Sequence, residues 1–199
     1  MSDEQTIAAY DKQVEAYAKL TSRASPDRDL LAFIALIKPG GRVLDLGCGP
    51  ANAAAELRNH GFAVDAVDAS PEMVRLANET HDIGARQAGF DDIDAAAAYD
   101  GIWANFSLLH ASAEDFPRHL LALYRALRPG GHFHIGMKLG TGSVRDRLGR
   151  HYSYYSQSEL TEHLNKAGFV VDDASTGKDM GLAGDVEPWI VLRAHKQAE

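Results

Sequence analysis

The segment that most constrains the fold is VLDLGCGPA, at residues 43–51. Residues 43–46 predict a short buried strand, the glycines after it permit a sharp turn, and Ala51 begins a helix. The backbone amides at the start of such a helix face the turn, and strand–turn–helix units of this kind bind nucleotides. The segment therefore predicts an α/β unit with a ligand at the carboxyl end of its first strand.

The residues around the turn separate two kinds of nucleotide site. A dinucleotide site reads G-x-G-x-x-G and cradles a pyrophosphate, whereas here Asp45 precedes Gly47 and Asn52 replaces the third glycine. A second acid, Asp68, ends the next apolar run. Two carboxylates suit S-adenosylmethionine, which carries a sulfonium, an ammonium and two ribose hydroxyls. We expect Asp45 to hold the methionine end of this cofactor and Asp68 to accept hydrogen bonds from the ribose.

Each feature also has a structural explanation. A G-x-G turn occurs in many α/β proteins, and Asp68 alone is typical of the cap of a helix that begins near Pro71. Their combination in one β-α-β unit favours the cofactor site. Cys48, the single cysteine, lies inside the turn. We expect it to be a small packing residue beneath the cofactor, rather than a nucleophile.

Length and charge narrow the class of protein. A chain of 199 residues predicts one domain over residues 1–199. The net charge of −8 argues against a nucleic-acid partner, because polyanion binding depends on lysine and arginine. Residues 1–6 lack the basic start of a signal peptide, and the longest apolar run, residues 30–37, is too short to cross a bilayer. These features predict a cytoplasmic monomer or homodimer without a membrane partner.

Apolar spacing predicts alternating strands and helices along the chain. The N-terminal region, residues 1–38, is expected to form one helix over 2–20 and a second that Ser25-Pro26 caps and that runs to residue 37. Residues 93–98 are expected to be a short helix or turn, and residues 139–156 a loop on the substrate side. Other helices are expected at 51–61, 71–80, 116–127 and 156–168, and strands at 43–46, 63–67, 85–88, 101–105, 132–138, 169–171 and 189–194.

The loop before the last strand is too short and too rich in glycine for a crossover helix, so that strand should pair antiparallel. Together the elements predict a three-layer, doubly wound α/β fold whose sheet has about seven strands and is otherwise parallel. Ligands are expected at the carboxyl edge, where strand order reverses.

Several of these segments resemble the class I S-adenosylmethionine-dependent methyltransferase family, and the likeness covers nearly the whole chain. It rests on residues 43–51, on the acidic loop at 67–73, on the fourth-strand segment at 99–110 and on LRPGG at 127–131. Residues 149–155 and Lys138 are similar to a small single-domain branch with members described as tellurite-resistance-like. The resemblance implies a Rossmann-like methyltransferase fold, S-adenosyl-L-methionine as cofactor and S-adenosyl-L-homocysteine as product.

The resemblance also implies contacts with the cofactor. Met73 should lie against adenine, with Phe90 beside the ring and Asp91, or alternatively Asp92, on the adenine amino group. Tyr10 either closes over the cofactor or packs the core, and Tyr17 has the same two roles. The complete expected cofactor set is Tyr10, Asp45, Gly47, Cys48, Gly49, Asp68, Ala69, Met73, Phe90, Asp91, Asn105 and Phe106.

Methyl transfer from a sulfonium is an in-line displacement, so the enzyme chiefly aligns the acceptor and excludes water. His110 is the best-placed base if the acceptor is a thiol or hydroxyl, or else it caps or packs. Residues expected to line the acceptor pocket are Lys138, Arg150, Tyr152 and Tyr155, whose charge favours a small anionic acceptor. The nine histidines show no compact metal-ligand spacing, so no metal is expected.

Rival functions share parts of this pattern. An NAD(P)-dependent oxidoreductase should show the third glycine and a catalytic lysine, tyrosine or histidine set, which this chain fits poorly. A nucleic-acid methyltransferase is disfavoured by charge and by the lack of an Asn/Asp-Pro-Pro-Tyr/Phe segment. A non-catalytic S-adenosylmethionine-binding protein would carry the same motifs as the enzyme.

Overall fold

The computed structural model of the protein describes residues 3–22 and 27–198. It confirms the predicted α/β fold, because seven strands form one sheet in the order β3-β2-β1-β4-β5-β9-β8. The five neighbouring strands β3, β2, β1, β4 and β5 pair in parallel, and β9 is antiparallel to both of its neighbours, β5 and β8. Strand order reverses between β1 and β4, beside the glycine turn. The seven strands are β1 (Arg42–Leu46), β2 (Ala63–Asp68), β3 (Arg86–Gln87), β4 (Tyr99–Asn105), β5 (Leu127–Lys138), β8 (Val170–Met180) and β9 (Val186–His195).

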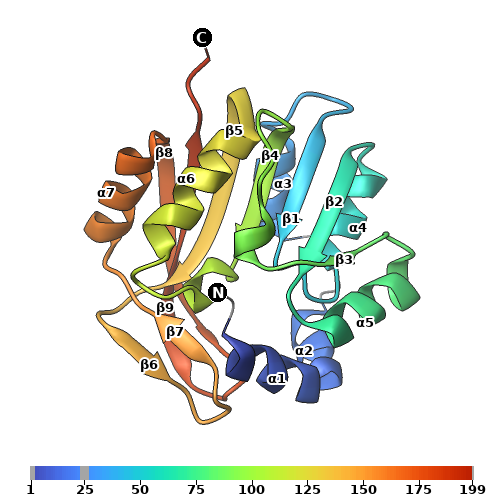
Figure 1. The fold of residues 1–199 in the computed structure, drawn as a ribbon, viewed down its shortest axis with the longest axis vertical. Helices are drawn as coiled ribbons and strands as arrows, with labels where there is room; N and C mark the ends of the chain where they lie inside the picture. The colour runs from blue at the N-terminus through green and yellow to red at the C-terminus, as the bar shows by residue number, and fades with distance from the viewer. Residues whose placement is uncertain (1–2, 23–26, 199) are drawn as a thin grey trace.

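Helices cover both faces of the sheet, which gives the predicted three layers (Figure 1). In that view α6 (Phe116–Ala126) and α7 (Gln157–Ala167) lie in front of the sheet, and α3 (Arg28–Ile34) and α4 (Asn52–Asn59) lie behind it. The lower end of the sheet is covered by α1 and α2 and by a separate hairpin of β6 and β7. The remaining elements are α1 (Glu4–Lys12), α2 (Val14–Thr21), α5 (Pro71–His81), β6 (Ser143–Arg145), β7 (His151–Ser153) and the 3-10 turns η1 (Phe90–Asp92) and η2 (Leu108–His110).

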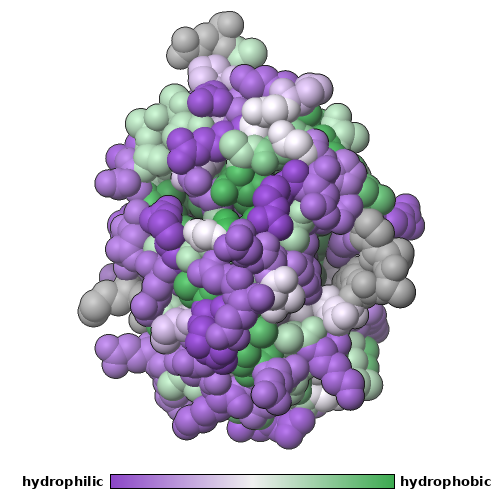
Figure 2. Space-filling model, turned by 90° about the vertical axis from the view of Figure 1, so that its right-hand side faces the viewer, coloured by the Kyte–Doolittle hydropathy of each residue, from purple (hydrophilic) through white to green (hydrophobic). Residues whose placement is uncertain are grey.

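Buried apolar clusters hold these layers together on both faces of the sheet. Alternate residues of a strand point to opposite faces, so Ile102 of β4 packs in the core that includes Leu120 of α6 and Leu160 of α7. Its neighbour Trp103 packs with Phe33 of α3 and with the α4 side chains on the other face. The outer surface seen in Figure 2 is largely hydrophilic, with apolar residues showing in small patches between polar ones.

The helix predicted for residues 2–20 is divided into α1 and α2, and residue 2 lies outside the described part of the chain. The chain tightens at Gln13, whose backbone N–H donates to the Tyr10 carbonyl three residues back. The rings of Tyr10 and Tyr17, one from each helix, meet edge to face with their centroids 5.3 Å apart.

The predicted cap at Ser25-Pro26 also lies outside the described residues. In the structure α3 is capped by Asp27, whose carboxylate accepts from the Asp29 amide at 2.8 Å. The helix ends at Ile34, before the predicted residue 37.

Residues 93–98, predicted as a short helix or turn, form no helix and bend at 96–97. Three further predictions for secondary structure were wrong. The segment predicted as a loop at 139–156 contains the antiparallel pair β6 and β7, and the strand predicted at 132–138 begins already at Leu127. Strand β8 continues to Met180, nine residues beyond the predicted end at 171. An edge strand with mostly exposed residues has no buried face, so no apolar alternation marks it in the sequence.

Candidate active site

Two adjoining cavities lie where the parallel strands end. The larger has a volume of about 830 Å³ and the smaller of about 80 Å³. Both are lined by Gly47 of the glycine turn, by Tyr10 and Tyr17 of the N-terminal helices, and by Phe106 after β4. The N-terminal helices therefore complete a site that the sheet edge begins.

The glycine turn passes very close to the loop that follows β4. Gly47 has a φ of 73°, and a Cβ on it would lie 2.4 Å from the Cβ of Ser107. Gly49 has a φ of 52°, and a Cβ there would lie 3.2 Å from the ring of Tyr17. Both the conformation and the close contact at Gly47 require glycine.

Asp68 links the two loops that border the smaller cavity. Its carboxylate accepts hydrogen bonds from the Gly49 amide at 2.8 Å and from the Ser70 amide at 2.9 Å. The cap of α5 is Ser70, whose hydroxyl accepts from the Met73 amide, so Asp68 is not the helix cap. Burial raises the pKa of Asp68 above its ordinary value. Each carboxylate oxygen still has a lone pair to offer to a ligand.

Asp45 is the deepest charged group near the turn. It lies on β1, is 2% exposed, and its Oδ2 atom has no hydrogen-bond partner among the described residues. Burial raises its pKa to about 7, and the negative charge of Asp68 adds to the shift. A buried carboxylate oxygen without a donor is costly, which makes this position suitable for a cationic or hydrogen-bond-donating ligand group.

The smaller cavity brings together most of the predicted adenosine contacts. Asp68, Ala69, Met73 and Phe90 all line it. Two acids after β3 are used elsewhere. Asp91 pairs with Arg118 at 2.6 Å, and the Asp92 carboxylate accepts from the Gly89 amide at 2.7 Å.

Residues at the end of β4 and directly after it line both cavities. Phe106 has a φ of 57°, and its amide donates to the Gly136 carbonyl at 3.0 Å. Asn105 lines the larger cavity, and its Oδ1 lies 3.0 Å from Nε2 of His134. The hydroxyl of Ser107 is buried and has no partner among the described residues, although it lies beside the turn.

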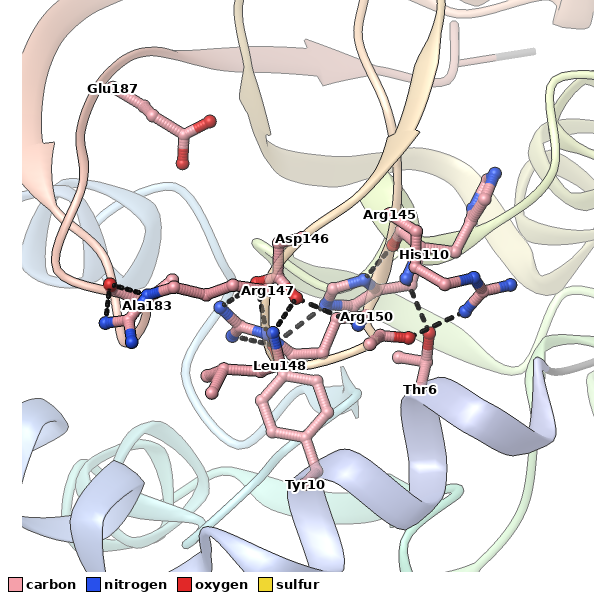
Figure 3. Close-up of polar contacts among 12 residues, drawn as sticks. Thr6, Tyr10, His110, Arg145, Asp146, Arg147, Leu148, Arg150, Ala183 and Glu187 are labelled. Atoms are coloured by element: carbon pink, nitrogen blue, oxygen red, sulfur yellow. Dashed lines mark hydrogen bonds and ion pairs between the residues drawn. The ribbon is translucent and has the colours of Figure 1, made fainter.

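His110 is held by two hydrogen bonds (Figure 3). Its Nδ1 lies 2.6 Å from the His151 carbonyl and must donate to it, so the neutral ring accepts at Nε2 from the Tyr10 hydroxyl at 2.8 Å. Burial lowers the pKa of His110 to about 3, and the charge of Arg150 contributes. His110 is therefore neutral at physiological pH, and Tyr10 occupies its acceptor nitrogen.

Arg150 is a buried cation at the larger cavity, with 2% exposure. Its Nη2 and Nε donate to the Asp146 carboxylate at 2.7 Å and 2.9 Å, and its Nη1 donates to the Tyr10 hydroxyl at 3.1 Å (Figure 3). The guanidinium also lies over the rings of Tyr10 and Tyr152, at 5.2 Å from each. These contacts hold the Arg150 side chain in place in the lining of the larger cavity.

Lys138 lies at the end of β5 in the same cavity and pairs with Glu187 of β9. Its ammonium lies 4.0 Å from the ring centroid of Tyr152. The Tyr154 hydroxyl donates to the other oxygen of Glu187 at 2.6 Å. Both predicted cations therefore have acidic partners, and an acceptor would have to share them.

The structure brings Lys138, Arg150 and Tyr152 to the larger cavity, together with Cys48. Burial raises the pKa of the Cys48 thiol, which opposes thiolate chemistry. Tyr155 is not brought there. It packs in the front core, where its ring stacks on Phe116 at 4.9 Å.

Sequence reasoning missed three residues of the cavity region, namely Asp146, Glu187 and Trp189. Glu187 and Trp189 line the larger cavity from β9, and Asp146 holds Arg150. No motif marks them. The extended hairpin of β8 and β9 carries Glu187 to the cavity, and its length was not predictable from apolar spacing.

In residues 3–22 and 27–198, no group of three or more His, Cys, Asp or Glu side chains is arranged to hold a metal ion. The same described residues contain no helix with the length and apolar character needed to cross a membrane.

Comparison with known proteins identifies relatives of this chain. A family model described as a methyltransferase domain matches residues 10–174. Trans-aconitate 2-methyltransferase from Rhodopseudomonas palustris (strain BisA53) is 32% identical over 178 residues, which cover 81% of this chain and 67% of that protein. Malonyl-[acyl-carrier protein] O-methyltransferase from Erwinia billingiae (strain Eb661) is 33% identical over 134 residues, which cover 65% of this chain and 52% of that protein. The chain spans about half to three fifths of the length of several curated relatives.

A solved structure has the same fold. Burkholderia thailandensis 1,6-didemethyltoxoflavin-N1-methyltransferase, with bound 1,6-didemethyltoxoflavin and S-adenosylhomocysteine, matches with a TM-score of 0.71 at 23% identity, over 99% of this chain and 91% of that chain. The likeness to a tellurite-resistance-like branch stays a prediction. From the family match and the fold together, the chain belongs to the class I S-adenosylmethionine-dependent methyltransferase family.

Proposed function

We propose that this protein transfers the methyl group of S-adenosylmethionine to a carboxylate of a small-molecule acid. The observation that carries the cofactor half of the proposal is the unpartnered Oδ2 of buried Asp45, two residues before the glycine turn. A ligand bearing an ammonium and a sulfonium would supply the donor and the charge that this oxygen lacks.

The chain's residues fit the cofactor along the length of both cavities. Asp68 would accept from the ribose hydroxyls, while Met73 and Phe90 would contact the adenine in the smaller cavity. Asp45 and the backbone of Asn105 and Phe106 would hold the methionine end in the larger one. When bound, the cofactor supplies an activated methyl group on a good leaving group.

The acceptor half of the proposal rests on two supports. The relatives described above are named for methylation of acids, trans-aconitate and malonyl-[acyl-carrier protein]. In this chain, Arg150 and Lys138 line the larger cavity, and each retains N–H groups that an acceptor carboxylate can share with their acidic partners.

The state of His110 agrees with an acid acceptor. A thiol or hydroxyl acceptor needs a base, but His110 has a low pKa and its Nε2 accepts from Tyr10. A carboxylate is already ionised at neutral pH, so no base is required. A lone pair of the acceptor oxygen forms the new bond to the methyl carbon, and the electron pair of the broken C–S bond stays on sulfur.

Calorimetry tests the cofactor and a panel tests the reaction. We expect the protein to bind S-adenosylmethionine and S-adenosylhomocysteine and to ignore NAD. With a panel of mono-, di- and tricarboxylates, we expect release of S-adenosylhomocysteine and a methyl ester detected by mass spectrometry. Cofactor binding without a methylated product from any acceptor, including thiols and amines, would instead indicate a non-catalytic binding protein.

A further inference from the structure

His134 is a buried histidine that the methyl-transfer chemistry above does not use. It lies on β5 with no exposed surface, and its ring stacks on Trp103 with centroids 3.6 Å apart. The rings of His134 and Phe33 also meet edge to face, with their centroids 6.3 Å apart. An apolar ring would fill this space without the cost of burying an imidazole.

The surroundings of His134 fix where its proton lies. Burial lowers its pKa to about 3, and the charge of Arg193 contributes, so the ring is neutral and carries one N–H. Its Nδ1 has no partner among the described residues, while Nε2 lies 3.0 Å from Oδ1 of Asn105. The proton therefore belongs on Nε2, where it is donated to the Asn105 side-chain oxygen.

This hydrogen bond sets the direction of the Asn105 carboxamide. The amide lies directly over Gly136, where an added Cβ would come within 2.5 Å of Oδ1. Because the oxygen faces His134, the NH2 group is the end left for the larger cavity that Asn105 lines. This NH2 group has no hydrogen-bond partner in the described part of the chain.

The position of Asn105 along the sheet edge places this donor between the two halves of the site. Asp45 of β1 pairs with Trp103 of β4, and Asn105 pairs with Gly136, two residues before Lys138 on β5. Along the carboxyl edge of the sheet, Asp45 at the predicted site for the methionine end of the cofactor comes first, the Asn105 amide comes next, and Lys138 follows. An N–H donor here would face the acceptor group nearest the methyl carbon.

We propose that the Asn105 NH2 group donates a hydrogen bond to the acceptor carboxylate and orients its attacking oxygen, and that His134 is a positioning residue that fixes the polarity of this amide. The inference rests on the proposed function, and it adds a specificity-determining residue to it. The amide donates to the oxygen that does not attack, which leaves a lone pair of the other oxygen directed at the methyl carbon.

The Asn105→Asp variant replaces the N–H donor with a negatively charged acceptor, and His134→Phe tests the orientation of the amide without adding a charge. The carboxylate of Asn105→Asp can accept from His134 Nε2 as the amide does, but it offers no N–H and repels a carboxylate ligand. His134→Phe keeps an aromatic ring on Trp103 and removes the N–H that orients Asn105. The matched control is His132→Phe, on the same strand and outside both cavity linings.

The experiment titrates malonate, succinate and trans-aconitate into the S-adenosylhomocysteine complex of each variant by calorimetry. We expect at least one of them to bind the wild type and to lose about tenfold to a hundredfold in affinity in Asn105→Asp, since hydrogen bonds to charged groups have this worth. The loss in His134→Phe should be smaller but measurable, because that variant keeps the amide donor and removes only the group that orients it. S-adenosylhomocysteine should bind all variants within about threefold, and His132→Phe should match the wild type throughout.

Other results would overturn the inference. If carboxylate affinity is unchanged in Asn105→Asp, or if the variant loses cofactor affinity instead, the amide does not recognise the acceptor. Binding of none of the three acids to the wild-type complex would also overturn it, while intact cofactor binding would leave the methyltransferase proposal standing. Nitrogen NMR of the imidazole supplies an independent readout, and a proton found on Nδ1 of His134 would contradict the positioning role.

Discussion

The backbone amide of Gly49 donates a hydrogen bond of 2.8 Å to the carboxylate of Asp68, which joins the loop after β1 to the loop after β2. The same carboxylate accepts from Ser70. One side chain thus shapes the glycine turn and faces the smaller cavity, so it couples the geometry of the turn to the cofactor contact.

Replacing Asp68 by Asn should weaken S-adenosylmethionine binding by at least about tenfold, because the ribose hydroxyls lose an ionised acceptor. Isothermal calorimetry at pH 8 measures the change. Asp65→Asn is the control, since Asp65 lies on the same strand and pairs with Arg42 and Tyr99, away from both cavities. Equal affinities in the two variants would remove Asp68 from the site.

Asp45 should make the apo protein less stable as pH rises. Its pKa is 3.8 ordinarily and about 7 in the folded protein, so between these values the folded state binds more protons than the unfolded state. The free energy of unfolding should therefore fall by on the order of 2 kcal/mol from pH 5 to pH 7 through this group. Urea unfolding at both pH values, in the wild type and in Asp45→Asn, should show a smaller decrease in the variant.

The raised pKa of Asp45 also predicts that this group releases a proton when the cofactor binds near neutral pH. A cationic ligand beside Asp45 favours its carboxylate and lowers its pKa. Calorimetry in two buffers with different ionisation enthalpies measures the number of protons released. A value that is the same in the wild type and in Asp45→Asn would show that the sulfonium and ammonium lie elsewhere.

Gly47→Ala should unfold more easily and bind the cofactor poorly, because its Cβ would lie 2.4 Å from that of Ser107 at a φ of 73°. Gly61→Ala is a matched control with a φ of 85° and no atom within 4 Å of the added Cβ. The control should cost only backbone strain, about 1 kcal/mol. Adding Ser107→Gly to Gly47→Ala should recover part of the thermal stability, and a failure to recover any would mean that strain, not contact, dominates.

Arg150→Ala should lower the free energy of unfolding by about 3–5 kcal/mol, because it leaves Asp146 without its buried partner. Arg145→Ala removes a more exposed pair with Asp3 and should cost much less. Chemical denaturation measures both. Because Arg150→Ala is expected to lose stability, Arg150→Gln, which removes the charge but keeps N–H donors, is the variant for acceptor affinity, and unchanged affinity in it would argue against an anionic acceptor.

His110 should stay neutral between pH 5 and pH 8. Its pKa is lowered to about 3 by burial, so its ring proton shifts should not titrate between pH 5 and pH 8 in NMR. Tyr10→Phe removes the hydroxyl that occupies Nε2. A midpoint between pH 6 and pH 7 in the wild type would restore His110 as a candidate base.

The parts of the fold that were predictable are those encoded by local sequence. The glycine turn and the start of α5 at Pro71 each depend on residues within one short segment, and apolar alternation marks the buried strands. The segment 127–131 was expected to precede the fifth strand, but β5 already begins at Leu127. Strand β8 was missed beyond residue 171 because its side chains face solvent at a sheet edge.

The acceptor side of the site was only partly predictable, because its contacts join residues far apart in the chain. Tyr10 meets His110 across 100 positions, and Lys138 meets Glu187 across 49. Sequence spacing indicates which cations reach the sheet edge, but not that each arrives with an acidic partner. Residues that are close in the chain can also point to different places. Tyr155 is only three positions from Tyr152, but its ring packs in the core and not in the larger cavity.

The N-terminal helix α1 is fastened to the β6–β7 hairpin at several points. The Asp3 carboxylate accepts from Arg145 at 2.8 Å, and the Thr6 hydroxyl accepts from the His151 amide at 2.8 Å. A purification tag fused ahead of Asp3 would be attached next to a residue that lines the smaller cavity. The other terminus lies at the far end of the molecule (Figure 1), so affinity handles and surface immobilisation belong there in any assay of this protein.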